Sequence, residues 1–272
     1  MDLNTVQRVR RPTAPEQLAL AEGEAFVAGG TWLFSEPQPH LTGLVDLTTL
    51  GWPDLEVSDE GLTIAATCTL AELLRFRPDP GWRASVLFGQ CVNSLVASFK
   101  IWNLATVGGN LCTTLPAGSI ISLTAALDAT VTIWSPDGTA RTVPVVDFVL
   151  GAQHNVLQPG ELLRSVHLGA SQLRSMTAHR KIALSPLGRS GSLVIGRVDL
   201  DGAAVFTVSA ATDRPHQLRY VRLPAADVLR RDLADVGPWY DDPHGSPDWR
   251  AHVTAVLAEE IRQELSEGGD VT

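Results

Sequence analysis

Cysteine is scarce in this sequence: only Cys68, Cys91 and Cys112 occur in 272 residues, and they lie far apart. No CxxC pair and no ladder of cysteine and histidine residues is present, which argues against a structural zinc site or a protein-bound iron–sulfur cluster. The seven histidines also lack the spacing of metal ligands. We therefore predict no metal site, and three buried free thiols in a reducing compartment.

Long apolar runs are also absent. No window of the sequence is long and apolar enough to span a bilayer, and the N-terminal segment MDLNTVQRVRRP has no apolar signal core. The formal net charge of −9 disfavours binding to nucleic acids or anionic membranes, because a surface of this sign repels phosphate. We expect a cytoplasmic protein that binds neither a nucleic acid nor a membrane.

Common catalytic and nucleotide-binding motifs are missing as well. The chain has no GxGxxG fingerprint, P-loop, HExxH or GxSxG motif, and no paired carboxylate or triad pattern stands out. Its 44% hydrophobic and 19% charged residues are nevertheless typical of a folded protein. We predict no catalytic residue within this chain.

The pattern of the sequence predicts three regions, at residues 1–54, 55–169 and 170–272. The apolar and alternating runs, together with helix caps at Thr13 and Thr69 and a hairpin turn at Asp201 and Gly202, predict an α+β protein. A small antiparallel sheet of three strands and a closing helix are expected at the C-terminal end. The predicted strands are 25–28, 44–47, 62–66, 130–134, 141–145, 192–199, 203–211 and 218–223; the predicted helices begin at 13, or cover 69–74, 82–103, 120–126 and 249–266.

Two glycine pairs raise the question of a ligand. The strand in AFVAGGTWLF runs into Gly29 and Gly30, and NLATVGGNLC repeats the pattern at Gly108 and Gly109. Without Cβ atoms, such turns can present successive backbone amides as a concave nest for anions, and Thr31 and Thr106 could add hydroxyl donors. Two nests that face each other would suit a pyrophosphate. Taken singly, each pair is better explained by a tight turn without a ligand.

The ordered set of motifs goes further than either pair alone. AFVAGGTWL followed by LVDLT, then ATVGGNLC, PAG and AALDATVTIW, resembles the flavin-binding medium subunit of the molybdenum hydroxylases, such as carbon monoxide dehydrogenase and xanthine dehydrogenase-like enzymes. Asp147-Phe148 and the segment 159–163 (PGELL) match a later pattern of that family. The resemblance implies a two-subdomain FAD-binding fold of the vanillyl-alcohol-oxidase (PCMH) type, followed by a small C-terminal domain.

The resemblance also implies which residues contact FAD. Ser119 stands where the family often has an acidic residue, and Trp32 stands where a small polar residue is common, so Trp32 either shields the site from water or packs against a neighbouring subunit. Leu163 could equally be a core leucine, and Lys181 an exposed surface charge. The implied FAD contacts are Val27, Ala28, Gly29, Gly30, Thr31, Trp32, Leu33, Thr106, Gly108, Gly109, Asn110, Ser119, Leu163 and Lys181.

By resemblance, the chain is the electron-transfer subunit of a heteromeric enzyme. It would hold non-covalent FAD, take electrons from a [2Fe-2S] small subunit next to a molybdopterin-binding large subunit, and pass them to NAD, a quinone or another acceptor. Redox chemistry in such a subunit belongs to the cofactor. Two alternatives stay open: a free-standing FAD-dependent oxidoreductase, and a binding or assembly protein that has the fold but no flavin.

Overall fold

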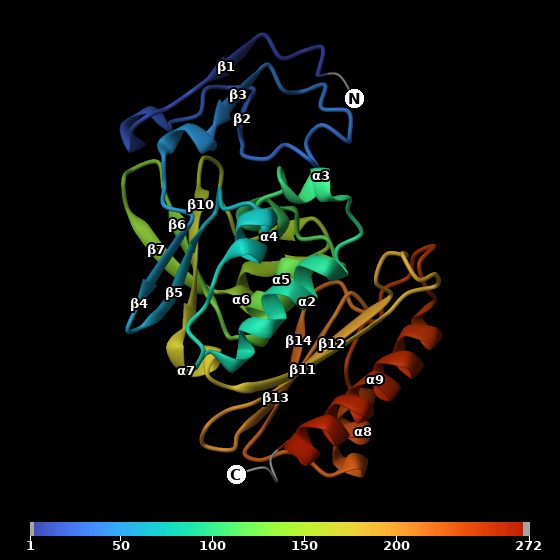
Figure 1. Cartoon of the computed structure of the whole chain (residues 1–272). Coiled ribbons are helices and arrows are strands. Elements are labelled where there is room, and N and C mark those ends of the chain that lie inside the picture. Colours follow the sequence, from blue (N-terminus) through green and yellow to red (C-terminus); the bar gives the residue numbers. More distant parts are fainter. Residues whose placement is uncertain (1–2, 269–272) are drawn as a thin grey trace.

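The computed structural model describes residues 3–268 (Figure 1). A small N-terminal sheet has the strand order β1-β3-β2, with both pairs parallel. Its elements are β1 (Arg8–Arg10), the 3-10 helix η1 (Pro15–Gln17), β2 (Glu24–Val27), β3 (Gly43–Asp46) and the 3-10 helix η2 (Leu47–Leu50).

One ion cluster closes this N-terminal sheet. The buried carboxylate of Glu24 accepts hydrogen bonds from Arg10 and from the amide of Ala21, and it also pairs with Arg8. The hydrogen bonds from Arg10 lower the pKa of Glu24 to about 2. The prediction of a helix from residue 13 is wrong except for the single 3-10 turn η1. The side chain of Thr13 does not cap this turn; instead, the Thr13 amide donates a hydrogen bond to the side chain of Gln17.

The second sheet is antiparallel and has the order β4-β5-β10-β6-β7. Its central strand β10 was not expected from the sequence, because Arg164, Ser165 and His167 interrupt the apolar pattern and a bulge lies between Leu163 and Ser165. The strands are β4 (Leu55–Ser58), β5 (Gly61–Ala65), β6 (Thr130–Trp134), β7 (Ala140–Pro144) and β10 (Leu162–Gly169).

Helices pack against one face of this sheet and form the main core with it (Figure 1). The helix cap expected at Thr69 is confirmed, since its hydroxyl accepts a hydrogen bond from the amide of Glu72. The prediction of a single helix over 82–103 is wrong. Helix α2 ends at Ser94, whose hydroxyl donates a hydrogen bond to Gln90 O, and Leu95 has an extended backbone. The elements are α1 (Leu70–Arg75), η3 (Arg83–Ser85), α2 (Val86–Ser94), α3 (Phe99–Trp102), α4 (Val107–Thr113), α5 (Ser119–Ala126), α6 (Val145–Phe148), β8 (Val149–Gly151) and β9 (His154–Asn155).

The C-terminal sheet has four strands, not the three expected, in the order β11-β12-β13-β14. The additional strand is β11, whose sequence MTAHRKI carries too many polar residues to stand out as a strand. Helix α9 packs along this sheet, with Ile261 and Leu265 against Gly196 of β12 (Figure 1). The elements are α7 (Ala170–Leu173), β11 (Met176–Ile182), β12 (Ser192–Val198), β13 (Ala204–Ser209), β14 (His216–Tyr220), α8 (Ala226–Ala234) and α9 (Pro247–Gly268).

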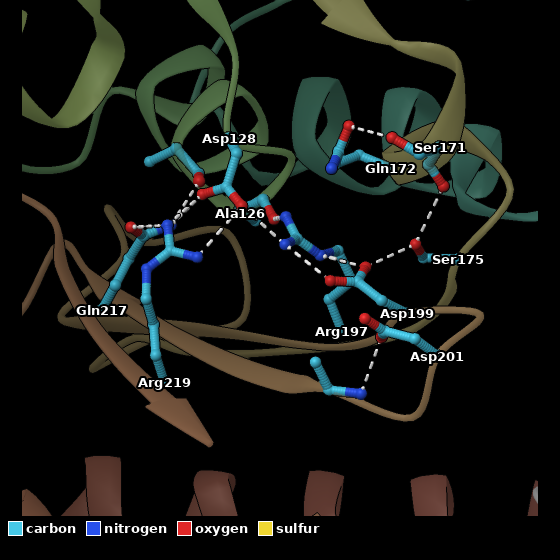
Figure 2. A network of polar contacts seen from close by, with 12 residues as sticks. Ala126, Asp128, Ser171, Gln172, Ser175, Arg197, Asp199, Asp201, Gln217 and Arg219 are labelled. Atoms are coloured by element: carbon cyan, nitrogen blue, oxygen red, sulfur yellow. Dashed lines mark hydrogen bonds and ion pairs between the residues drawn. The ribbon is translucent and has the colours of Figure 1, made fainter. Parts of the chain in front are cut away.

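A buried arginine joins the C-terminal sheet to the main core. The guanidinium of Arg197 donates to Ala126 O at 2.6 Å, to Asp128 Oδ2 at 2.6 Å and to Asp199 Oδ2 at 3.1 Å (Figure 2). Arg219 approaches the same Asp128 from strand β14. Burial opposes ionisation of Asp128, but the hydrogen bond from Arg219 and the charge of Arg197 hold its pKa below the usual range.

None of the helices formed by residues 3–268 has both the length and the apolar character needed to cross a membrane.

The two arginines give a matched test of this junction. The side chain of Arg197 is 2% exposed and that of Arg219 is 54% exposed. We expect Arg197→Met to lower the free energy of unfolding by about 3–5 kcal/mol, because it strands buried acceptors. Arg219→Met should cost at most about 1 kcal/mol. Urea unfolding of the two variants checks this, and equal losses would contradict the assigned role of Arg197.

Candidate functional site

The first glycine pair lies in a loop that leaves the end of strand β2. Gly30 adopts a φ of +67°, a left-handed conformation that favours glycine. The loop then closes on itself through hydrogen bonds from Phe34 N to Gly30 O and from Ser35 N to Trp32 O, both 2.9 Å long. The segment that follows the glycines is therefore a series of tight turns.

The backbone amides of this loop are not used by the fold. Within residues 3–268, the amides of Gly29, Gly30, Thr31, Trp32 and Leu33 donate no hydrogen bond to another residue. All five residues line a cleft. A run of free amides around a left-handed glycine is the arrangement that binds anions, so the sequence hypothesis of an amide nest fits this loop.

The second glycine pair has a different structure. Gly108 and Gly109 lie in the first turn of helix α4, and Thr106 is its N-cap residue. Every amide of that turn has a partner: Val107 N donates to Cys68 O, Gly108 N to Ala66 O, and Gly109 N to the Thr106 hydroxyl, at 2.9–3.0 Å. The expectation of a second amide nest is therefore wrong.

The two motifs nevertheless touch, because Gly29 packs directly against the backbone of Leu104 and Ala105. A Cβ atom placed on Gly29 would lie 1.8 Å from the carbonyl oxygen of Leu104 and 3.2 Å from Ala105 N. No side chain fits there, so a glycine is needed for the first loop to rest on the segment that leads into α4. Gly108 has a separate packing role, because a Cβ there would lie 2.5 Å from the Cβ of Ala66.

The cleft between the two motifs has a volume of about 460 Å³, in the range of small-molecule sites. The first loop, from Val27 to Leu33, forms one part of the lining. No residue that lines the cleft carries a formal charge. Burial raises the pKa of the one lining thiol, Cys112, to about 12, so this group stays neutral. The other lining residues are Phe26, Leu95, Ala105, Thr106, Gly109, Asn110, Thr113, Leu115 and Gln153.

Two side chains of the second motif can act on a ligand in the cleft. Asn110 Oδ1 accepts the amide of Ile120 at 3.0 Å, which assigns the oxygen and leaves its Nδ2 group as a donor without a partner in residues 3–268. The Thr106 hydroxyl accepts from Gly109 N, so its proton is free to be donated. The cleft therefore offers neutral donors from both sides, in addition to the loop amides.

Four of the residues implied by the resemblance do not line the cleft. Leu163 belongs to the main core, and Gly108 is buried against Ala66. Ser119 is completely buried at the start of α5, and its hydroxyl has no hydrogen-bond partner among the residues described. Lys181 lies on strand β11, on the same face as His179, which contacts Ser94 beside the cleft residue Leu95.

Sequence reasoning missed several lining residues. Leu95 follows the unexpected end of α2, and Gln153 lies in the turn between β8 and β9 with a φ of +56°. Neither segment contains a motif. Cys112 is the last residue of the second motif and Thr113 directly follows it, so a search along helix α4 could have found them.

The contact of Gly29 predicts a sharp difference between two glycine substitutions. Gly29→Ala should force the loops apart and lower the free energy of unfolding by about 3 kcal/mol, because its Cβ meets rigid backbone. Gly89→Ala, in helix α2, meets no atom within 4 Å and should be neutral or stabilise by up to about 1 kcal/mol. Thermal and urea unfolding measure both. A neutral Gly29→Ala would refute the contact.

Comparisons with known proteins were consistent with this geometry. The family model for the FAD binding domain in molybdopterin dehydrogenase matches residues 9–170. The chain is 30% identical to the nicotinate dehydrogenase FAD-subunit of Eubacterium barkeri over 188 residues, which is 62% of either protein. It is 36% identical over 120 residues to xanthine dehydrogenase of Oryza sativa subsp. japonica, which is 42% of this chain but only 9% of the length of that protein.

Solved structures share the fold over nearly the whole chain. Quinoline 2-oxidoreductase from Pseudomonas putida 86 superposes with a TM-score of 0.80 at 20% identity, covering 98% of this chain and 99% of that one. Reconstituted CO dehydrogenase from Oligotropha carboxidovorans gives a TM-score of 0.80 at 20% identity, covering 94% and 95%. The expected α+β class and the resemblance are thus confirmed, and the chain belongs to the family of FAD binding domains in molybdopterin dehydrogenases.

Proposed function

We propose that the cleft binds FAD without a covalent bond, with the pyrophosphate against the free amides of residues 29–33. The observation that carries this proposal is the run of five amides that the fold leaves without acceptors, next to a left-handed glycine. Oriented amides attract an anion without the desolvation cost that a buried lysine or arginine would bring. No histidine or tyrosine lines the cleft, and burial raises the pKa of the one lining thiol, Cys112, so that it stays unreactive; both observations support non-covalent binding.

The remaining residues of the cleft fit the same group. Thr106 and Asn110 supply donors opposite the loop, and Gly109 leaves room where a side chain would project. Phe26, Leu95 and Leu115 provide apolar wall for a flat ring system. The buried, unpartnered hydroxyl of Ser119 does not line the cleft, so it would act on the group only through a bridging water, since buried polar groups normally have a partner.

The proposed role is that of the FAD-binding electron-transfer subunit of a heteromeric molybdenum-containing hydroxylase. The flavin supplies one- and two-electron transfer when it is bound. The chain binds and orients it, and walls the site with neutral groups that neither donate nor accept a proton near neutral pH. The match to the FAD binding domain in molybdopterin dehydrogenase supports a [2Fe-2S] subunit beside a molybdopterin subunit as the source of electrons.

The absorbance spectrum of the purified chain tests the cofactor. We expect flavin bands and, after acid denaturation, release of FAD rather than FMN into the supernatant. A colourless chain that does not take up added FAD would overturn the proposal and favour a flavin-free binding protein. Turnover of an organic substrate by the isolated yellow chain would instead favour a free-standing oxidoreductase.

Asn110 offers a test of the donor side of the cleft. Asn110→Asp keeps the acceptor for Ile120 N but replaces the free donor with a negative oxygen, so it should weaken FAD binding at least tenfold. Asn93→Asp adds the same charge on the exposed face of α2 and should leave the affinity unchanged. Fluorescence titration of the apo-protein with FAD measures both values. Equal affinities would remove Asn110 from the site.

A further inference from the structure

Exposed apolar side chains are concentrated in three short segments, two of which border the cleft. Of the fifteen large apolar side chains exposed in residues 3–268, eight lie in only three short segments, 32–34, 96–104 and 184–187. We call these three segments the apolar rim. Contiguous exposed apolar surface on a folded domain commonly marks a contact with another molecule.

The first two segments of the apolar rim border the cleft directly. Trp32 lines the cleft and is 37% exposed, and Phe34 packs its ring on Gly30. Helix α3 and its flanks carry the second segment, where Phe99 is 66% exposed and Leu104 touches the first loop through Gly29. Within α3, Trp102 packs against the main core, whereas Phe99 and Ile101 are exposed to solvent.

The third segment is the connection between strands β11 and β12, beside the end of α2 (Figure 1). Ser190 in this connection donates a hydrogen bond to Ser94 O, one residue before the cleft residue Leu95. Leu187 in the same connection is 89% exposed. The connection between β11 and β12 in the C-terminal sheet is therefore part of the apolar rim, together with the segments next to the two glycine motifs.

The charge pattern of the apolar rim indicates what it binds. Residues 28–35, 94–109 and 182–191 contain no acidic side chain and only two basic ones, Lys100 and Arg189. Neither cation forms an ion pair within residues 3–268. In a chain with a net charge of −9, these three segments are therefore apolar and carry only positive charge, and the exposed Glu36 directly follows the first of them.

We infer that the apolar rim is the docking surface for the protein that exchanges electrons with the cleft, and that this partner presents an apolar centre flanked by carboxylates. The inference rests on the proposed function. A second copy of this chain is a poorer fit, because a two-fold contact would place Lys100 and Arg189 opposite like charges. An anionic membrane is disfavoured by the net charge of the whole chain.

The test uses the affinity-tagged full-length chain expressed in its native host, with iron and FAD measured in the isolated material. The wild type should carry iron together with FAD. Phe99→Asp and Leu187→Asp should each keep FAD but lower the ratio of iron to FAD at least tenfold, because a carboxylate in an apolar contact is desolvated and faces the partner's carboxylates.

Matched controls come from the other end of the C-terminal domain. Leu200 and Val221 are 72% and 88% exposed, and Leu200→Asp and Val221→Asp should retain both iron and FAD. Iron that stays with the Phe99→Asp and Leu187→Asp variants, or a dimer of the isolated wild-type chain that these variants abolish, would overturn the docking surface. A wild type that carries FAD but no iron would instead overturn the electron-transfer part of the proposed function.

Discussion

The approach of Gly29 to the peptide of Leu104 and Ala105 is the constraint on which the whole site depends. A Cβ atom at this point would lie 1.8 Å from the Leu104 oxygen, so the two loops can touch only where one of them has no side chain. This contact sets the width of the cleft, because strand β2 fixes one loop and helix α4 the other. The amides of this loop find no acceptor among residues 3–268. The fold thereby creates the donors that we assign to a pyrophosphate.

The two glycine pairs look alike in sequence but have different physical roles. Gly30 allows a left-handed turn and so leaves amides free, whereas Gly108 allows helix α4 to pack against Ala66. The amides of α4 are all bonded, so the attraction for an anion comes from one side of the cleft and only side-chain donors from the other. A sequence pattern shows that a backbone must come close to something. It does not show whether that neighbour is a ligand or the protein itself.

The same limit explains which parts of the structure were predictable. Local sequence patterns predicted strands such as β6 and β12, the cap at Thr69 and the order of the two motifs. These features depend on residues that are neighbours in the chain. Strands β10 and β11 could not be predicted in this way, because polar residues such as Arg164 and His179 lie in them and only pairing with distant strands holds them extended. Cleft residues such as Leu95 and Gln153 were missed for the same reason, since they reach the site through tertiary contacts and carry no motif.

The distribution of charge links the fold to its proposed chemistry. Buried or half-buried charges stabilise the contacts between elements: Glu24 in the N-terminal sheet, Glu161 next to Arg141 of strand β7, and Asp128 next to Arg197 of the C-terminal sheet. The cleft has none, and its one thiol stays protonated. A group reduced there can therefore exchange protons only with solvent or with another molecule, not with this chain. An uncharged lining of this kind suits a subunit that stores and passes on electrons. Acid–base chemistry would then be carried out by the protein that supplies the electrons.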